Sequence, residues 1–452
     1  MKRHKFILYL TFTIILSGCG SSKQGDQSES QIAQDLEESL FTHIVDAWYP
    51  RCLDSLYGGY LPDFEYDWTL SDGLQEKSLV QQSRHLWALS YLYQQYPANS
   101  KFLEYAKWGY DFMKENFPDD HYGGLYNSCE RSGDPALNSL FFKRSYAQAF
   151  AIHGLAKYFE VSGDSTALAM AINTFLWLDE KARDPVHGGY FESLDRDGRP
   201  QEAGPDAASK PGYLPHTGLK EFNSSIHILE ALTELYRVWP DSLAEIRLEE
   251  MYTLFKEKLI HPDGYLVLYF NPDWTSVPKS TMDSLSQGNS WYTQHISFGH
   301  DVETAYLLLE AAQALGKGED EQAYKLAKKL VDHSLDHGWD DEKGGFYYIG
   351  YKQEDYVLIH DPHKAWWTQA EGLNALHLMH SLNPNDKRDY YGKFLQLWKY
   401  IDTYLIDKEN GGWYNYGLDN YPENKTLKKS HNWKASYHNV RGVGEVVQRN
   451  RE

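Results

Sequence analysis

KGGFYY occupies residues 343–348, and a glycine-aromatic segment of this kind occurs six times along the chain. The other five copies are LYGGY at 56–60, HYGGLY at 121–126, HGGYF at 187–191, DGYLVLY at 263–269 and NGGWYNY at 410–416. Successive copies are 65 to 80 residues apart. Paired glycines suit the unusual dihedral angles of a tight turn, and the aromatic residues after them suit a short strand. The regular spacing indicates repeats of one supersecondary unit.

Two helix-like segments lie between consecutive copies. Apolar residues recur in them at helical spacing, as do Leu86, Leu89 and Tyr93. The predicted helix pairs are Val80–Tyr96 with Lys101–Asn116, Tyr146–Val161 with Asp164–Lys181, Glu221–Trp239 with Leu243–Leu259, Val302–Leu315 with Asp320–Leu335, and Trp366–Leu382 with Arg388–Ile406. The repeated unit is therefore a helix, a loop with a short hairpin, and a second helix.

Helical hairpins of this kind cannot bury their apolar faces alone, so they pack against one another. We expect an all-α fold in which six hairpins close into a toroid, an (α/α)6 barrel. An open solenoid of the same units is the alternative, and six copies favour closure. Residues 39–452 then form one domain, although the chain length alone suggests about three. The functional site should lie in the mouth of the ring, at the ends of the inner helices.

Composition narrows the class of protein. The chain has 452 residues, of which 42% are hydrophobic and 24% charged, so it is neither disordered nor a multi-span membrane protein. Its formal net charge of −20 argues against a nucleic-acid partner. Aromatic residues make up 15%, which fits a large aromatic core or a groove that stacks sugar rings. No CxxC or HExxH motif supports a metal site.

The N-terminal segment has the form of an export signal. Basic residues precede an apolar run over 6–16, which ends in Leu16-Ser17-Gly18-Cys19. This ending resembles a bacterial lipoprotein signal, so we expect residues 1–18 to be removed and Cys19 to be lipidated. Residues 19–38 are polar and are expected to form a flexible tether. The expected location is a membrane, with the outer membrane favoured by the Gly-Ser-Ser that follows Cys19.

Polar residues cluster where inner helices should be apolar. The clusters are Asn223 with His227, then His300 with Glu303 and Tyr306, then Trp367 with Glu371, and finally Trp433 with His438, while Arg84 opens a further apolar segment. A single histidine of this kind is more often a hydrogen-bonded structural residue than a catalyst. Because several hairpins carry such groups, a closed ring would gather them, and buried charges need partners or a function.

These segments resemble the N-acylglucosamine 2-epimerase family, most closely its cellobiose 2-epimerase branch. The matching motifs are RHLW with Arg84, NSSIHILEA with Asn223 and His227, GHDVE with His300 and Glu303, WWTQAE with Trp367 and Glu371, and WKASYHNVR with Trp433 and His438. The resemblance runs from about Trp48 to Val447. It implies the same (α/α)6 barrel.

The resemblance also implies a sugar 2-epimerase that needs neither metal nor cofactor. The pyranose ring opens with help from His227, His438 removes the C2 proton, and His300 returns a proton to the opposite face of the enediolate. Arg84 would stabilise the enediolate oxygens. The expected sugar contacts are Asn223, Glu303, Tyr306, Trp367, Glu371 and Trp433. Histidine suits proton transfer near neutral pH, and arginine remains charged when desolvated.

The expected substrate is an aldose, or the reducing-end residue of a disaccharide, converted between glucose-type and mannose-type. Two positions depart from the cellobiose 2-epimerase pattern: Ser225 replaces a usual second histidine, and Tyr306 replaces a usual tryptophan. Two other classes remain open: a glycoside hydrolase that uses Glu303 and Glu371 as its carboxylate pair, and a non-catalytic glycan-binding lipoprotein. Oligomeric state is left open.

Overall fold

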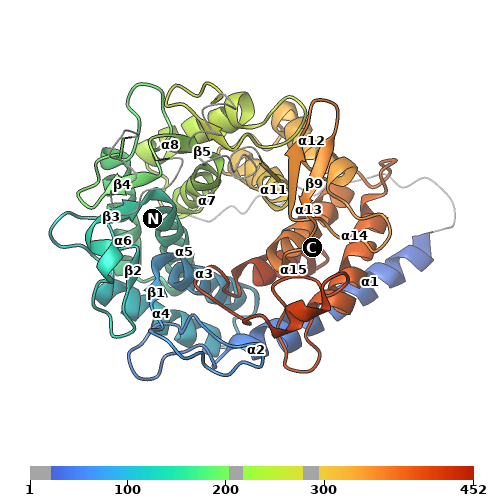
Figure 1. Cartoon of the computed structure of the whole chain (residues 1–452), viewed down its shortest axis with the longest axis horizontal. Coiled ribbons are helices and arrows are strands. Elements are labelled where there is room, and N and C mark those ends of the chain that lie inside the picture. Colours follow the sequence, from blue (N-terminus) through green and yellow to red (C-terminus); the bar gives the residue numbers. More distant parts are fainter. Residues whose placement is uncertain (1–21, 203–216, 278–294, 452) are drawn as a thin grey trace, which may run out of the picture.

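The computed structural model describes residues 22–202, 217–277 and 295–451. Within these ranges the helices form two concentric rings, which Figure 1 shows from one end. The inner helices are α3 (Leu79–Gln95), α5 (Ser145–Ser162), α7 (Phe222–Val238), α11 (Phe298–Ala314), α13 (Trp366–Leu382) and α15 (Tyr437–Arg449). The predicted leader over 1–18 and the predicted lipidation site Cys19 lie outside the described residues.

The outer helices run beside them. They are α4 (Lys101–Asn116), α6 (Ser165–Lys181), α8 (Ser242–Leu254) continued by η4 (Phe255–Leu259), α12 (Glu321–His337), and α14 (Tyr390–Tyr400) continued by η5 (Ile401–Leu405). Aspartates begin four of them: the Asp164, Asp241, Asp320 and Asp389 side chains accept backbone N–H bonds at the first turns of α6, α8, α12 and α14. The predicted (α/α)6 barrel is confirmed.

The last inner helix, α15, pairs with the first described segment of the chain. Helices α1 (Ser22–Ser39), η1 (Leu40–Val45) and α2 (Asp46–Trp48) follow one another, and α1 and η1 pack on α15. The prediction of a flexible tether over 19–38 is therefore wrong for the part that forms α1. Leu36 and Leu40 are spaced one turn apart and are fully buried, which a polar linker would not achieve.

Short strands link neighbouring units at one end of the barrel. The pairs are β1 (Lys77–Ser78) with β2 (Ser128–Cys129), β3 (Phe142–Arg144) with β4 (Ser193–Asp195), and β5 (Lys220–Glu221) with β6 (Tyr269–Phe270), and the three-stranded sheet is β7 (His295–Ser297), β8 (Ile349–Lys352) and β9 (Val357–Asp361). All pairs are antiparallel. Several inner helices start directly after one of these strands, so the strands fix where those helices begin.

A buried ion pair recurs at the same end. In five of the six units an aspartate at the glycine turn contacts a lysine of the next unit at 2.6 to 3.0 Å; the pairs are Asp54–Lys77, Asp119–Lys143, Asp184–Lys220, Asp340–Lys364 and Asp407–Lys429. The turn itself requires glycine. Gly59 has φ +66°, and an added Cβ would lie 2.7 Å from Oε1 of Gln82. Both features make the loops of this end rigid.

No helix within the described ranges is long and apolar enough to cross a membrane. Two short 3₁₀ segments, η2 (Leu137–Leu140) and η6 (Pro422–Thr426), complete the described helical elements.

Candidate active site

A cavity of about 310 Å³ opens where the inner helices begin. All six inner helices contribute to it from their first two turns. The lining residues are Arg84, Tyr146, Asn223, His227, His300, Glu303, Tyr348, Ala365, Trp366, Trp367, Asn415, Tyr416, His431, Trp433 and His438. Helix N-termini carry partial positive charge, so this end of the ring favours a bound or developing anion.

The structure gathers most of the residues singled out in the sequence. Eight of the ten predicted sugar-site residues line this cavity, namely Arg84, Asn223, His227, His300, Glu303, Trp367, Trp433 and His438. The other two lie behind the wall: the Tyr306 hydroxyl donates to Oε2 of Glu371 at 2.6 Å, and both side chains are buried. Tyr306 and Glu371 therefore support the wall, and the prediction that they contact sugar is corrected.

Four histidines line the cavity, and the three singled out in the sequence are each anchored through Nδ1. The contacts are His227 to Glu230 at 2.9 Å, His438 to Glu371 at 2.5 Å, and His300 to the Ser297 hydroxyl at 2.6 Å. Nε2 is then the nitrogen left for a ligand. Burial lowers the pKa of His227 and of His438 to about 4, and it lowers the pKa of His300 well below its usual value. Neutral imidazoles of this kind are ready to accept a proton.

Arg84 is the cation of the cavity. Its guanidinium donates to the Trp433 carbonyl at 2.7 Å and to the Tyr146 hydroxyl at 2.9 Å, and it lies 4.4 Å from the Phe150 ring centre. These three contacts fix its position without neutralising its charge. The Trp433 ring is 60% exposed at the rim, which leaves an aromatic face open to a ligand.

A buried charged layer lies directly beneath the histidines. The Arg441 guanidinium donates to carboxylate oxygens of Glu230, Glu303 and Glu371, with 2.6 Å to Glu371. Burial raises the pKa of Glu303 to about 8, whereas the Arg441 charge holds the pKa of Glu371 below its usual value. One cation thus serves three carboxylates, with Glu303 holding a proton near neutral pH.

Glu303, Glu371 and His438 have ligand atoms within 4.8 Å of one another, a spacing that a metal ion could use. Arg441 already bonds both carboxylates, and the Glu371–His438 contact uses Nδ1 of the histidine. Most of these donor atoms are therefore committed to protein partners, although Oε2 of Glu303 has no hydrogen-bond partner among the described residues. A reaction without metal or cofactor stays a prediction.

Three tyrosines that line this cavity, and Glu230 behind His227, were not singled out in the sequence. Glu230 stands three residues after His227, at a spacing that places both on one helix face. Tyr348 and Tyr416 come at the ends of two glycine-aromatic segments, in which the whole motif was read as a turn and a strand. Tyr146 is the second residue of an inner helix, and it belongs to none of the polar clusters that the sequence indicated.

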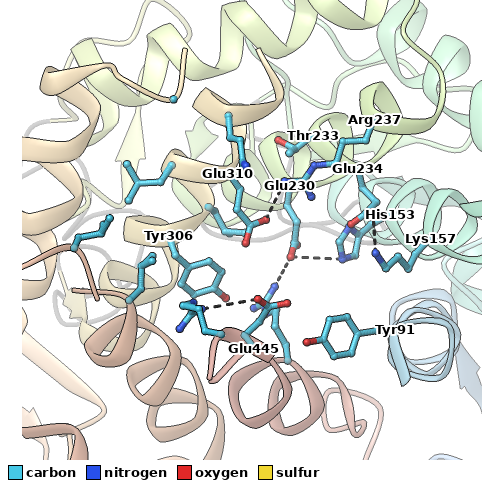
Figure 2. A pocket seen from close by; sticks show the side chains of 18 of the residues that line it. Tyr91, His153, Lys157, Glu230, Thr233, Glu234, Arg237, Tyr306, Glu310 and Glu445 are labelled. Carbon is cyan, nitrogen blue, oxygen red and sulfur yellow. Dashed lines mark hydrogen bonds and ion pairs between the residues drawn. The ribbon is translucent and has the colours of Figure 1, made fainter. Parts of the chain in front are cut away.

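A second cavity, of about 720 Å³, lies at the opposite end of the inner helices, where they finish (Figure 2). Its charges are paired with one another, as in Lys157–Glu234 at 3.5 Å and Arg237–Glu310 at 3.8 Å. Trp87 stacks on both Tyr91 and His153, with ring centres 5.1 and 5.3 Å apart. Most aromatic faces and charges here are already paired within the protein. The smaller, histidine-lined cavity is therefore the better candidate for the active site.

The family model for N-acylglucosamine 2-epimerase matches residues 59–441, a stretch that contains every one of the cavity-lining residues. The chain belongs to this family. Cellobiose 2-epimerase of Bacteroides fragilis is 28% identical to it over 418 residues, covering 92% of this chain and 98% of that protein. D-mannose isomerase of Marinomonas mediterranea is 25% identical, with the same coverage of both chains.

Solved structures agree. Cellobiose 2-epimerase from Spirochaeta thermophila superposes on this N-acylglucosamine 2-epimerase family member with a TM-score of 0.77 at 29% identity, covering 94% of this chain and 98% of that one. The protein is thus a sugar 2-epimerase or isomerase. An α-mannanase from Bacteroides thetaiotaomicron matches with a TM-score of 0.57 at only 10% identity, which is a likeness of fold alone. The hydrolase and binding-protein alternatives are therefore set aside.

Proposed function

We propose that this enzyme inverts C2 of an aldose through ring opening and an enediolate, with His438 and His300 as the two acid/base groups. The observation that carries the proposal is that both rings line one cavity and both contact Trp367, with ring centres 4.6 Å apart for His300 and 5.6 Å apart for His438. Inversion next to a carbonyl needs proton transfer on two faces of one carbon, and two separate imidazoles meet that need.

The proton acceptor is assigned to His438. Its Nδ1–H donates to the Glu371 carboxylate, so Nε2 keeps its lone pair and takes the C2 proton. The imidazolium that forms is stabilised by the same carboxylate. His300 then delivers a proton from its Nε2 to the opposite face of C2. His227, with Glu230 behind it, assists ring opening at O1 and O5.

The enediolate oxygens carry the charge that develops during the reaction. Arg84 supplies a fixed cation in the cavity, and the N-termini of six inner helices point toward it. Glu303, which holds a proton near neutral pH, is able to donate a hydrogen bond to the same oxygens. The electrostatic design therefore favours the intermediate over the neutral sugar.

We assign the substrate to a disaccharide with a glucose-type residue at its reducing end. The reducing-end residue occupies the cavity beside Trp367, and the second residue lies across the exposed ring of Trp433 with Tyr348 and Tyr416 nearby. The relatives named cellobiose 2-epimerase support this choice, and the one named D-mannose isomerase supports a monosaccharide as the alternative.

The test is turnover in D₂O on cellobiose, lactose, mannobiose, glucose and mannose, followed by NMR of the products. The proposal expects one deuterium at C2 of a new mannose-type or glucose-type epimer, with the glycosidic bond intact. Epimer formed without label, or reducing sugar released by bond cleavage, contradicts it. Conversion of free mannose to a ketose, with every disaccharide inert, would select the isomerase alternative.

We also propose that the chain is exported and anchored through lipid on Cys19. The support is the sequence Leu16-Ser17-Gly18-Cys19 after a basic and apolar leader. A Cys19→Ala chain expressed in a Gram-negative host should lose labelled fatty acid and move from the membrane to the soluble fraction. Equal fatty-acid labelling of both chains would contradict the proposal.

A further inference from the structure

Three of the histidines that line the active site differ in the group that faces Nδ1. A carboxylate stands behind two of them, and a serine hydroxyl stands behind the third; the pairs are His227–Glu230 at 2.9 Å, His438–Glu371 at 2.5 Å and His300–Ser297 at 2.6 Å. Ser297 ends strand β7, which pairs with β8, and it directly precedes helix α11. Its side chain makes no capping bond to the helix, so the hydroxyl serves His300.

A carboxylate and a hydroxyl impose different proton chemistry on an imidazole. An ionised carboxylate only accepts, so it holds a proton on Nδ1 and stabilises the doubly protonated ring. A hydroxyl accepts or donates, so it tolerates either tautomer and adds no charge to balance the imidazolium. His438 is therefore the better proton acceptor of the two, and His300, once protonated, is the stronger acid.

The surroundings of His300 act in the same direction. Its ring packs against Phe222 at 4.9 Å and Trp367 at 4.6 Å, both apolar faces. After burial, the titratable groups that disfavour a positive charge on the His300 ring are His227, His295, His438 and Arg84. Together with burial they hold the pKa of His300 well below its usual value.

We propose that Ser297 is a positioning residue that holds the His300 ring toward C2. It stands where His227 and His438 have a carboxylate, so His300 gives up a proton more readily than His438 does. This inference rests on the proposed epimerase function. In the glucose-to-mannose direction, the C2 proton moves to Nε2 of His438 and the electron pair enters the enediolate. His300, which has taken up a proton from water and enters this step doubly protonated, gives its Nε2 proton to the opposite face of C2 and keeps Nδ1–H bonded to the Ser297 oxygen. Both rings exchange their protons with water after product leaves.

The test compares S297A, S297T and S297D with wild type in both directions of the reaction across pH. S297D places a carboxylate behind His300 and should raise its proton affinity by about one to three pH units. The high-pH limb of kcat/KM then moves up where His300 donates, and the low-pH limb moves up in the reverse direction, where His300 must be the base. A merely structural role would move neither limb.

Removing the hydroxyl should lower kcat by about 3- to 10-fold in S297A, the usual effect of one hydrogen bond, and S297T should restore most of it. The control is S90A, because Ser90 is a buried inner-helix serine whose hydroxyl bonds only the Leu86 carbonyl among described partners. Folding is checked by circular dichroism and thermal unfolding. Folded S297A with wild-type kcat, or folded S297D with both limbs unmoved, overturns the proposal.

A second readout needs no substrate. Nitrogen NMR of histidine-labelled resting protein, with the His300 signals assigned by their loss in H300Q, should show His300 protonating at higher pH in S297D than in wild type. Should wild type convert no aldose, the proposed function fails, and this titration still decides the contact between Ser297 and His300. Should S297D not fold, the kcat values of S297A and S297T decide it.

Discussion

The two ends of the barrel are built from the same six helices and do opposite things with charge. At the starting end, four imidazoles and one unneutralised guanidinium surround a cavity of about 310 Å³. At the finishing end, acids and bases neutralise each other around a cavity of about 720 Å³ (Figure 2). The comparison teaches that the active site is better located by polar groups left free to bind a ligand than by the volume of a cavity.

Helix direction explains part of the contrast. Six N-termini converge on the smaller cavity, so a negatively charged intermediate is stabilised there before any side chain is counted. The other end meets six C-termini, which disfavour an anion. Between the two ends, Arg441 joins the layers by bonding Glu230, Glu303 and Glu371.

The largest expected effect is a loss of activity that occurs on substitution at one cavity and not at the other. H438Q should lower kcat/KM by about 10²- to 10⁴-fold, because one of the two proton-transfer groups is removed. The matched change at the other cavity, E445Q, should leave kcat/KM within about 2-fold of wild type. Both are measured by epimer formation on the substrate proposed above, with folding checked by circular dichroism. Equal losses in the two variants would erase the functional distinction between the cavities.

Substitution of Arg441, in the charged layer between the two cavities, should lower the stability of the protein. R441M leaves buried carboxylates without their cation, and we expect the free energy of unfolding to fall by about 3–5 kcal/mol. R451M removes an exposed arginine paired with Glu37 and should cost about 1 kcal/mol or less. Urea unfolding at neutral pH measures both. A loss in R441M as small as that in R451M would show that the layer contributes little to the fold.

The smallest expected effect is the pH dependence of stability, which should have opposite signs at the two ends of the barrel. His227 has its pKa lowered by burial from 6.5 to about 4, so the unfolded chain binds more protons, and stability falls as pH drops from about 6.5 to 4. Burial raises the pKa of Glu310 from 4.5 to about 7, so stability falls as pH rises through that window.

Two substitutions separate these contributions. H227Q should flatten the loss of stability on acidification by about 1–3 kcal/mol. E310Q should flatten the loss at rising pH by less, because the Glu310 side chain is 37% exposed and solvent screens it. Urea unfolding between pH 4.5 and 8 gives both slopes. Slopes that change in the same direction in both variants would contradict the opposite chemistry of the two ends.

The repeats predicted most of this architecture from the sequence alone. The glycine-aromatic turns located the helix pairs, and α4 and α13 begin and end where predicted. The start of α11 was placed at Val302 instead of Phe298, because Gly299 and His300 do not look helical. The burial of Leu36 was not predicted, because it stands in a segment rich in polar residues. A single apolar side chain there does not indicate a packed helix until the contact of that helix with α15 is known.

The sequence predicted which residues belong to the site, but it did not predict which of them reach the cavity and which lie below it. His227, His300 and His438 stand near helix starts, and closure of the ring brings them to one cavity. Tyr306 stands on the same helix as His300, yet it faces the layer below, where it bonds Glu371. Which of two positions near one helix start reaches the cavity depends on how the neighbouring helices rotate, and spacing along one chain does not contain that information.

The pairing of the first described helix with the last has a consequence for biogenesis. Every other wall of the cavity is synthesised before α15, which brings His438, Arg441 and the surface that receives α1. A nascent chain without it holds Glu230, Glu303 and Glu371 with no guanidinium among them. Competence for turnover and completion of the ring thus arrive together, once the last helix has left the ribosome, so we expect a prematurely terminated product to be inert as well as unstable.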